Sequence, residues 1–195
     1  MPFLAAFEAC KNSAEEKVEN QPLQMELLNM FVQDQAVRGK VLTDLINKYA
    51  IDNSQISTTD KSTIDAANQK RLKEIIQEAG FPTRKLVGKD AVQGAFFIIQ
   101  HADGDKEWQQ SQLKNIERAV KNGDLDGQRY AYLYDRIRVD SGEKQVYGTQ
   151  FEKIDRAKKT VRLSAIEDAE NLDNRRRQIG MMPIDMYKKL VLQDL

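Results

Sequence analysis

Residues 90–102 read DAVQGAFFIIQHA, and apolar side chains occupy almost every side of this segment. A segment of this length that is apolar all round is typical of a helix that packs on all its faces. Its few polar positions form one narrow strip, in which Gln93 and Gln100 flank the line that leads to His101. The segment therefore predicts a central helix whose polar strip ends near the only histidine of the chain.

The segments around it are mostly helical in pattern. We expect helices over residues 3–17, 22–38, 41–49, 65–79, 106–121, 126–138 and 167–179 and after Pro183, with a loop at 52–64. Near residues 146–166 the period changes, because β-branched and aromatic residues flank an Asp-Arg-Ala-Lys-Lys turn. The predicted fold class is mainly α, a single-domain helical array around the central apolar helix, with one small antiparallel β-hairpin of strands 146–154 and 160–166.

A chain of 195 residues is long enough for one domain with a sizeable core. We expect one helical domain over residues 21–195, preceded by an N-terminal helix or stub over residues 1–20. Residues 1–10 contain a short apolar run, but Glu8 interrupts it and no basic residue precedes it. Two interpretations of residues 1–20 stay open, a part of the fold or the remnant of an export signal.

Composition and charge narrow the class of protein. Hydrophobic residues make up 41% of the chain and charged residues 31%, as in ordinary globular proteins. The 30 basic and 30 acidic residues balance, and no region has the basic excess that binding to a phosphate backbone requires, so we expect no nucleic-acid partner. No apolar run approaches the length of a membrane span, so we expect no membrane partner. Cys10 is the only cysteine and excludes an internal disulfide, so we expect a cytoplasmic, reducing location.

His101 is the first candidate for chemistry. An imidazole titrates near neutral pH and can act as a general acid or base. The alternative is a structural histidine that bonds a backbone carbonyl or, as a cation, favours the end of its helix. Asp34 and Arg38 lie four residues apart on the stripe of helix 22–38 that faces the core. We expect either a structural ion pair between them or an aspartate that orients His101 as part of a catalytic pair.

Further polar residues stand in short boxes between apolar segments, and buried polar groups need partners or a task. The candidates for substrate contacts are Gln35, Arg38, Gln100, Asp103, Asp135, Arg136, Gln145, Tyr147, Thr149, Gln150, Arg175 and Arg176. On a strand, Tyr147 and Thr149 share one face and Gln150 takes the other, so a common ligand requires a bulge at Gly148. The run of arginines at 175–177 predicts either an anion site or, more commonly, a solvated helix face.

The sequence contains few of the residue patterns that are typical of metal or cofactor sites. One histidine and one cysteine do not make a usual zinc site. Carboxylates at Asp34, Asp103 and Asp135 leave magnesium or manganese open, but no ligand spacing supports it, so we assign no metal ligands. Phosphate-binding glycine loops and nucleophile elbows are absent from the sequence, and the cofactor remains unknown.

Taken together, the boxes resemble an uncharacterised, mostly bacterial family catalogued as a domain of unknown function. The resemblance runs from about Leu23 to Tyr187. The boxes that carry it are Asp34-Gln35-x-x-Arg38, Asp65-x-x-Asn68, Gly80-Phe81-Pro82, Val87-Gly88, Gln100-His101-Ala102-Asp103, Tyr130-Ala131-x-Leu133-x-Asp135-Arg136, Gln145-x-Tyr147-Gly148-Thr149-Gln150, Ile166-Glu167-Asp168 and Asp173-x-Arg175-Arg176. The resemblance implies that the polar boxes are the family's signature, but it supplies no activity. At the hairpin turn the chain departs from the family, because Arg-Ala-Lys-Lys replaces an expected glycine.

The leading hypothesis is an enzyme, a hydrolase or group transferase, that acts on a small polar or anionic metabolite with His101 as general acid or base and Asp34 as its orienting group. Arginines at 38, 136 and 176 are the expected anion contacts. The alternative is a non-catalytic module that binds a metabolite or another protein. A third interpretation is a set of purely structural polar networks. The oligomeric state is unknown.

Overall fold

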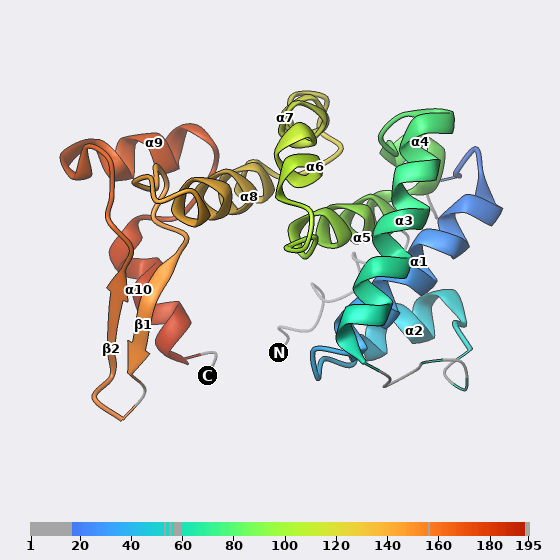
Figure 1. Ribbon diagram of the computed structural model, residues 1–195, viewed down its shortest axis with the longest axis horizontal. Coiled ribbons are helices and arrows are strands. Elements are labelled where there is room, and N and C mark those ends of the chain that lie inside the picture. Colours follow the sequence, from blue (N-terminus) through green and yellow to red (C-terminus); the bar gives the residue numbers. More distant parts are fainter. Residues whose placement is uncertain (1–16, 53, 55, 57–59, 156, 194–195) are drawn as a thin grey trace, which may run out of the picture.

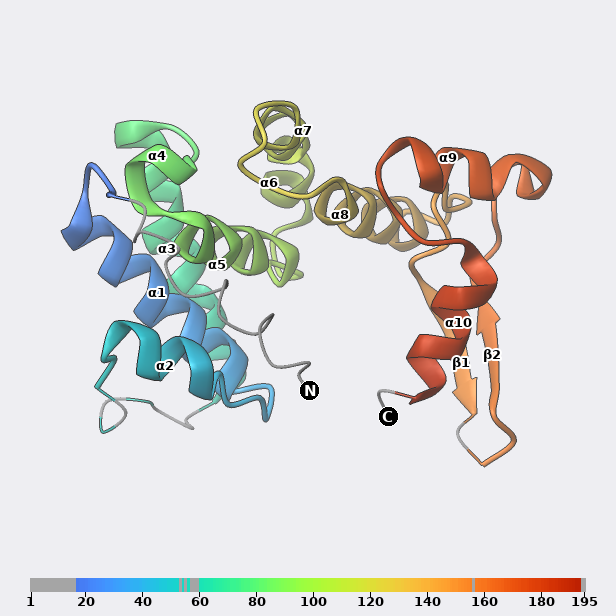
Figure 2. The same ribbon diagram turned by 180° about the vertical axis from the view of Figure 1, so that it is seen from behind.

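The computed structural model describes residues 17–52, 54, 56, 60–155 and 157–193. These residues form an arch, with helices α1 to α5 on one side, α6 to α8 across the top, and the hairpin with α9 and α10 on the other side (Figures 1 and 2). The helices are α1 Gln21–Ala36, α2 Thr43–Tyr49, α3 Lys61–Ala79, α4 Arg84–Val87, α5 Lys89–Gln100, α6 Lys106–Ser111, α7 Leu113–Lys121, α8 Gly127–Asp140, the 3-10 turn Ala169–Asn171, α9 Leu172–Gln178 and α10 Ile184–Gln193. The strands are β1 Phe151–Asp155 and β2 Thr160–Leu163.

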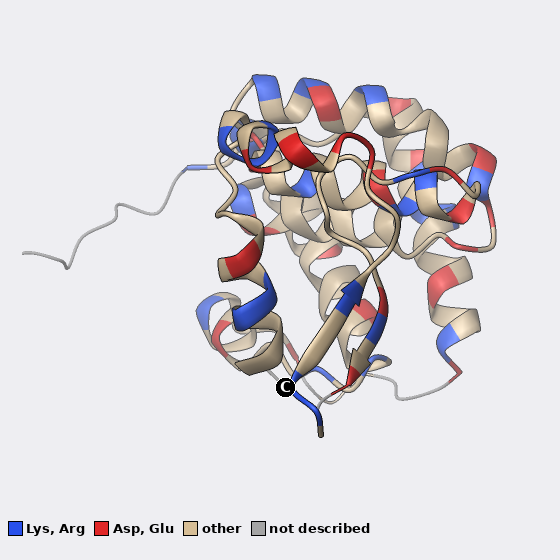
Figure 3. Ribbon diagram, turned by 90° about the vertical axis from the view of Figure 1, so that its left-hand side faces the viewer, with Lys and Arg blue, Asp and Glu red and all other residues tan. Residues whose placement is uncertain are grey.

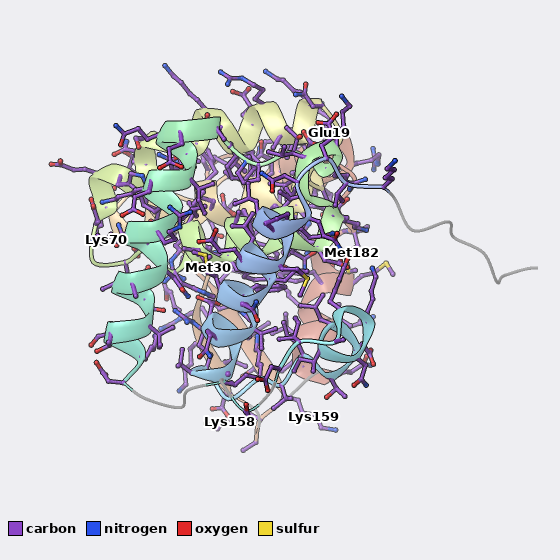
Figure 4. The ribbon with its side chains drawn as sticks, turned by 90° about the vertical axis from the view of Figure 1, so that its right-hand side faces the viewer. Glu19, Met30, Lys70, Lys158, Lys159 and Met182 are labelled. Atoms are coloured by element: carbon purple, nitrogen blue, oxygen red, sulfur yellow. The ribbon has the colours of Figure 1, made fainter. Side chains whose placement is uncertain are left out.

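The mainly helical class with one antiparallel hairpin is confirmed. The apolar segment forms α5, which packs against α1, α3 and α4, and Val92, Phe96 and Ile99 are fully buried. Gly94 allows the close approach of α1, since a Cβ at this position would lie 2.7 Å from the Cβ of Phe31. Met30 lies among the side chains between α1 and α3 (Figure 4). The core therefore forms around α5, as its sequence predicts.

Several helix ends follow from capping residues. Asp60 accepts a hydrogen bond from the N–H of Thr63 and starts α3 at Lys61, four residues earlier than the apolar period indicates. Gln112 divides the expected helix 106–121 into α6 and α7. Helix α4 was not expected, and Thr83 caps it. The expected helix 167–179 is a 3-10 turn followed by α9, because Asp168 adopts a left-handed backbone conformation.

The hairpin is shorter than predicted. Strand β1 pairs antiparallel with β2 from Phe151 onwards, so the expectation of a strand from residue 146 is wrong. Strand β2 ends at Leu163 instead of residue 166. The segment before β1 folds around a carboxylate of α8, as described below.

The division into residues 1–20 and 21–195 stays a prediction, and most of the helix expected at 3–17 lies outside the described residues. Within the described part of the chain, no helix combines the length and the apolar character needed to cross a membrane. Lys and Arg alternate with Asp and Glu over the elements that face the viewer in Figure 3.

Candidate functional site

His101 is the cap residue that directly follows α5, and Asp34 lies in the last turns of the neighbouring helix α1. Nδ1 of His101 lies 2.9 Å from Oδ1 and 3.0 Å from Oδ2 of Asp34. An ionised carboxylate only accepts hydrogen bonds, so Nδ1 carries the proton in this contact. No hydrogen bond to Nε2 is present among the described residues, and the His101 side chain keeps 16% of its surface exposed.

Asp34 is 1% exposed, and two groups satisfy its carboxylate besides His101. Nε2 of Gln35 donates to Oδ2 at 2.7 Å, and Nη1 of Arg38 lies 3.0 Å from Oδ1. Nη2 of Arg38 also binds both oxygens of Asp65, at 2.8 and 2.9 Å. The guanidinium of Arg38 is therefore engaged by two acids, and Asp65, which was not a predicted site residue, completes the cluster.

The imidazole lies against the ring of Phe97. The ring of Phe97 stacks on Phe31 and on His101, with centroid distances of 5.2 and 5.8 Å. The guanidinium of Arg129, from the first turn of α8, lies over the same Phe97 ring at 5.0 Å and over Phe96 at 5.6 Å. Phe96 and Phe97 of α5 therefore make cation–π contacts with the Arg129 guanidinium on the side of α5 that α8 covers.

The side chain of Arg129 makes no hydrogen bond and no ion pair with any described residue. Burial lowers the pKa of its guanidinium from the usual value, because nearby charge does not compensate for the lost water. An arginine with an unpaired, half-buried side chain, over the same Phe97 ring that contacts His101, is a candidate anion contact. Sequence reasoning missed it, since Asp126 three residues earlier looks like an ordinary helical partner.

The side chain of Gln100 is another unpaired group. Its Oε1 atom is buried and has no hydrogen-bond partner among the described residues. The neighbouring backbone is satisfied, because Nε2 of Gln109 donates to the carbonyl oxygens of Ile99 and Gln100 at 3.0 and 3.1 Å. An orphaned buried oxygen beside His101 is unusual in a folded protein and agrees with a site that a ligand or water completes.

Asp135 centres a second cluster, in the C-terminal half. Its fully buried carboxylate accepts the backbone N–H groups of Val146, Tyr147 and Thr149 and the hydroxyl of Thr149, at 2.7 to 3.1 Å. Gly148, with a φ of +69°, lets the chain turn around the carboxylate. This is why residues 146–150 do not begin a strand.

Two glutamines close the same turn. Nε2 of Gln145 donates to the carbonyl oxygens of Gln150 and Ser164, at 2.9 and 2.8 Å. The backbone N–H of Gln150 donates to Oε1 of Gln145 at 2.8 Å. Gln145, Thr149 and the backbone of Gln150 therefore satisfy each other or Asp135, which is the pattern of a structural network.

Two of the three arginines of α9 donate hydrogen bonds to the backbone of this turn. Arg175 donates through Nε to the carbonyl oxygen of Val146 at 3.0 Å. Arg176 is fully buried and donates through Nη1 to the carbonyl oxygen of Tyr147 at 2.6 Å. The interpretation of this run as a solvated helix face is wrong for Arg176, because the side chain crosses the interior to reach the turn.

The predicted site residues thus fall into separate groups. Asp34, Gln35, Arg38 and His101 form one cluster, and Asp135, Gln145, Tyr147, Thr149, Gln150, Arg175 and Arg176 contribute to the other. Asp103 and Arg136 form an ion pair at 2.6 Å outside both. Among the described residues, no direct hydrogen bond joins the two clusters, and no group of three His, Cys, Asp or Glu side chains could hold a metal ion.

Residues 21–195 match the model of a family of unknown function, DUF6624. The chain belongs to this family. The DUF6624 match spans every element from α1 to α10 and includes both polar clusters. No curated protein and no solved structure matches the chain. Membership of DUF6624 thus confirms the resemblance to an uncharacterised family and assigns no reaction.

Proposed function

We propose that the protein is an enzyme, a hydrolase or group transferase, that acts on a small anionic metabolite with His101 as its general acid and base. The observation that carries the proposal is the contact of both Asp34 oxygens with Nδ1, which leaves Nε2 of His101 without a partner among the described residues. This division of the two ring nitrogens is what a general base requires.

In the proposed reaction, Nε2 takes a proton from a water molecule or substrate hydroxyl as that oxygen attacks an electrophilic centre. The resulting imidazolium faces the Asp34 carboxylate, which stabilises its charge. The same proton then passes from Nε2 to the leaving group, so His101 returns to its neutral form. Asp34 acts as the orienting residue and does not itself change protonation.

The substrate's negative charge is assigned to Arg129. Of the three arginines expected from the sequence, Arg38 is engaged by Asp34 and Asp65 and Arg136 by Asp103, and Arg176 belongs to the other cluster, away from His101. Arg129 instead has a guanidinium free to bind, above the ring that also carries His101. A carboxylate or phosphate at this position would compensate the desolvation of Arg129.

The alternative function is a non-catalytic binding module, and the cavities favour it. Three described cavities have volumes of about 340 to 440 Å³, and none has His101 in its wall. A partly exposed histidine is as suitable for binding a partner as for catalysis. The experiment below separates the two functions.

The test incubates the purified protein with a defined mixture of small carboxylates and phosphate esters and follows each compound by mass spectrometry. The proposal expects the wild type to consume at least one compound and His101→Gln to lose about 100-fold or more of that rate while it keeps its fold. Arg129→Gln should chiefly raise KM, and Arg118→Gln, an exposed arginine of α7, serves as its matched control. Turnover that survives His101→Gln would refute the catalytic role, and ligand binding without turnover in the wild type would establish the binding module.

A further inference from the structure

A cavity of about 360 Å³ lies in the C-terminal half, away from the His101 cluster. Its walls come from α8, from the end of β1, from α9, and from α10 with the loop that precedes it. A cavity of this size is at the lower end of the range for small-molecule sites. Its polar and apolar walls are arranged in a way that indicates the chemistry of a ligand.

Arg176 supplies the charged part of the wall. Its Nε donates to the carbonyl oxygen of Met182 and its Nη1 to that of Tyr147, both at 2.6 Å. Nη2 is closed to solvent and has no hydrogen-bond partner among the described residues. A buried guanidinium nitrogen without an acceptor is costly, and the two engaged nitrogens hold it in a fixed position.

Two tyrosines provide a further unused donor. Nε2 of Gln128 donates to the hydroxyl of Tyr132 at 2.7 Å, and this hydroxyl donates to that of Tyr187 at 3.1 Å. The Tyr187 hydroxyl then has its own proton left, and no acceptor for it is present among the described residues. Burial raises the pKa of Tyr187 well above the usual value, so this proton is retained. This series of hydrogen bonds therefore ends at the Tyr187 hydroxyl, which still needs an acceptor for its proton.

The remaining wall is apolar and open at the rim. Ile154, Met182 and Leu190 line the cavity and are 40%, 40% and 37% exposed. They are three of the five large apolar side chains that are exposed in the described part of the chain. Met182 is labelled in Figure 4, where the C-terminal half lies behind α1 and α2 and away from the viewer. Exposed apolar groups around a polar floor suit a ligand with one charged end and an apolar body.

We propose that this cavity binds a small amphiphilic monocarboxylate, with its carboxylate against Nη2 of Arg176 and the Tyr187 hydroxyl and its apolar body along Ile154, Met182 and Leu190. The ring of Tyr187 lies over the guanidinium at 5.0 Å, so the carboxylate reaches Nη2 when this ring shifts. One free guanidinium nitrogen matches a single negative charge better than the double charge of a phosphate ester. The site is independent of the function proposed for His101.

The test uses octanoate as the probe and octanamide, its neutral counterpart, as the control. The chain contains six methionines, and 13C-methyl spectra resolve where a ligand binds. Octanoate should shift the methyl signals of Met181 and Met182 in a saturable way and leave those of Met25 and Met30 in place. Its affinity should exceed that of octanamide by about tenfold, the effect of one charged hydrogen bond. Equal affinities, or shifts elsewhere only, would overturn the proposal.

Variants locate the binding without depending on Arg176, whose replacement threatens the turn at Tyr147. Leu190→Trp fills the rim and should abolish octanoate binding, whereas Met186→Trp, on the same helix but outside the cavity wall, should leave it unchanged. Tyr187→Phe should weaken octanoate and leave octanamide unaffected. If octanoate fails to bind and sedimentation shows a dimer that Leu190→Trp dissociates, the apolar rim is an interface between two copies and the ligand site is refuted.

Discussion

Nδ1 of His101 contacts both carboxylate oxygens of Asp34, a residue 67 positions earlier in the chain, at 2.9 and 3.0 Å. The contact joins the end of α5 to the end of α1, and it is possible because Gly94 brings these two helices close together. The carboxylate is buried and the imidazole is partly exposed. The buried carboxylate therefore keeps the proton on Nδ1, and Nε2 remains available to accept a proton from a substrate.

Asp34→Asn is expected to change which ring nitrogen carries the proton. In the wild type, the neutral imidazole should be protonated on Nδ1, because only an acceptor faces it. An asparagine amide can donate to Nδ1 instead, which moves the proton to Nε2 in a substantial fraction of molecules. Long-range 1H–15N spectra of the single histidine measure this directly. Asp44→Asn on α2 is the control, and an unchanged tautomer in Asp34→Asn would contradict the proposed orienting role.

Arg129→Met should stabilise the protein. The substitution keeps an apolar stem over Phe96 and Phe97 and removes a desolvated charge that has no described partner. We expect a gain of about 0.5–1 kcal/mol in the free energy of unfolding. Urea titration provides the measurement. A clear loss of stability would mean that the cation–aromatic contacts outweigh the desolvation, and would assign Arg129 a structural role.

Gly94→Ala should destabilise the packing of α1 on α5. The new Cβ would lie 2.7 Å from the Cβ of Phe31 and 3.2 Å from the carbonyl oxygen of Leu27, and neither neighbour is the free end of a flexible side chain. The expected loss is about 1–3 kcal/mol, the usual cost of overpacking a core. Gly104→Ala is the matched control, since nothing lies within 4 Å of its added Cβ. Equal effects in the two variants, measured in urea, would contradict the close approach.

Asp135→Asn should cost about 2–4 kcal/mol, because an amide nitrogen would face N–H groups that now donate to a buried carboxylate oxygen. The turn at residues 145–150 should loosen, with faster amide exchange at Thr149. Asp103→Asn breaks an exposed pair with Arg136 and should cost no more than about 1 kcal/mol. Thermal melts of both variants give the comparison, and a neutral Asp135→Asn would show that the turn forms without its carboxylate.

Ionised Asp90 should contribute to the stability of the protein, and this contribution should be lost at acidic pH. Its burial favours the neutral form, but hydrogen bonds from Lys48 and Tyr49 outweigh that effect and lower the pKa of the carboxyl. A lowered folded-state pKa adds stability above the unfolded pKa, and this stability is lost as the pH falls through the folded value. Because Lys48 is largely exposed, the contribution should be no more than about 1 kcal/mol.

The corresponding measurement compares melting temperatures of wild type and Asp90→Asn between pH 7 and acidic pH. The variant should be less stable at neutral pH, and the difference should shrink below the carboxyl's unfolded pKa of about 3.9. Asp185→Asn, at an 83% exposed side chain, should show no such convergence. A difference that stays constant on acidification would rule out the charge of Asp90 as its cause.

Local sequence predicted the elements that depend on local interactions. The apolar period over residues 90–102 indicates α5, and α3 ends at residue 79 and α6 starts at residue 106 as the sequence predicts. The stripe of Met30, Phe31 and Asp34 on α1 is buried as its spacing indicates. Each of these features follows from side chains within about four positions of one another, which is the range over which a helix period and a cap act.

Only the tertiary structure decided how the polar residues are partnered. β-Branched and aromatic residues at 146–150 favour a strand, but Asp135 on another element draws their N–H groups into a turn. Arg176 is buried because the turn at Tyr147 and the ring of Tyr187 on α10 pack against its guanidinium. The Arg129 side chain on α8 lies over the Phe97 ring and has no charged partner within the described part of the chain. Neither environment can be read from the residues near these arginines in the sequence. Backbone propensities differ by less than about 1 kcal/mol per residue, whereas a buried charge without partners costs several, so the placement of charges prevailed over local preference.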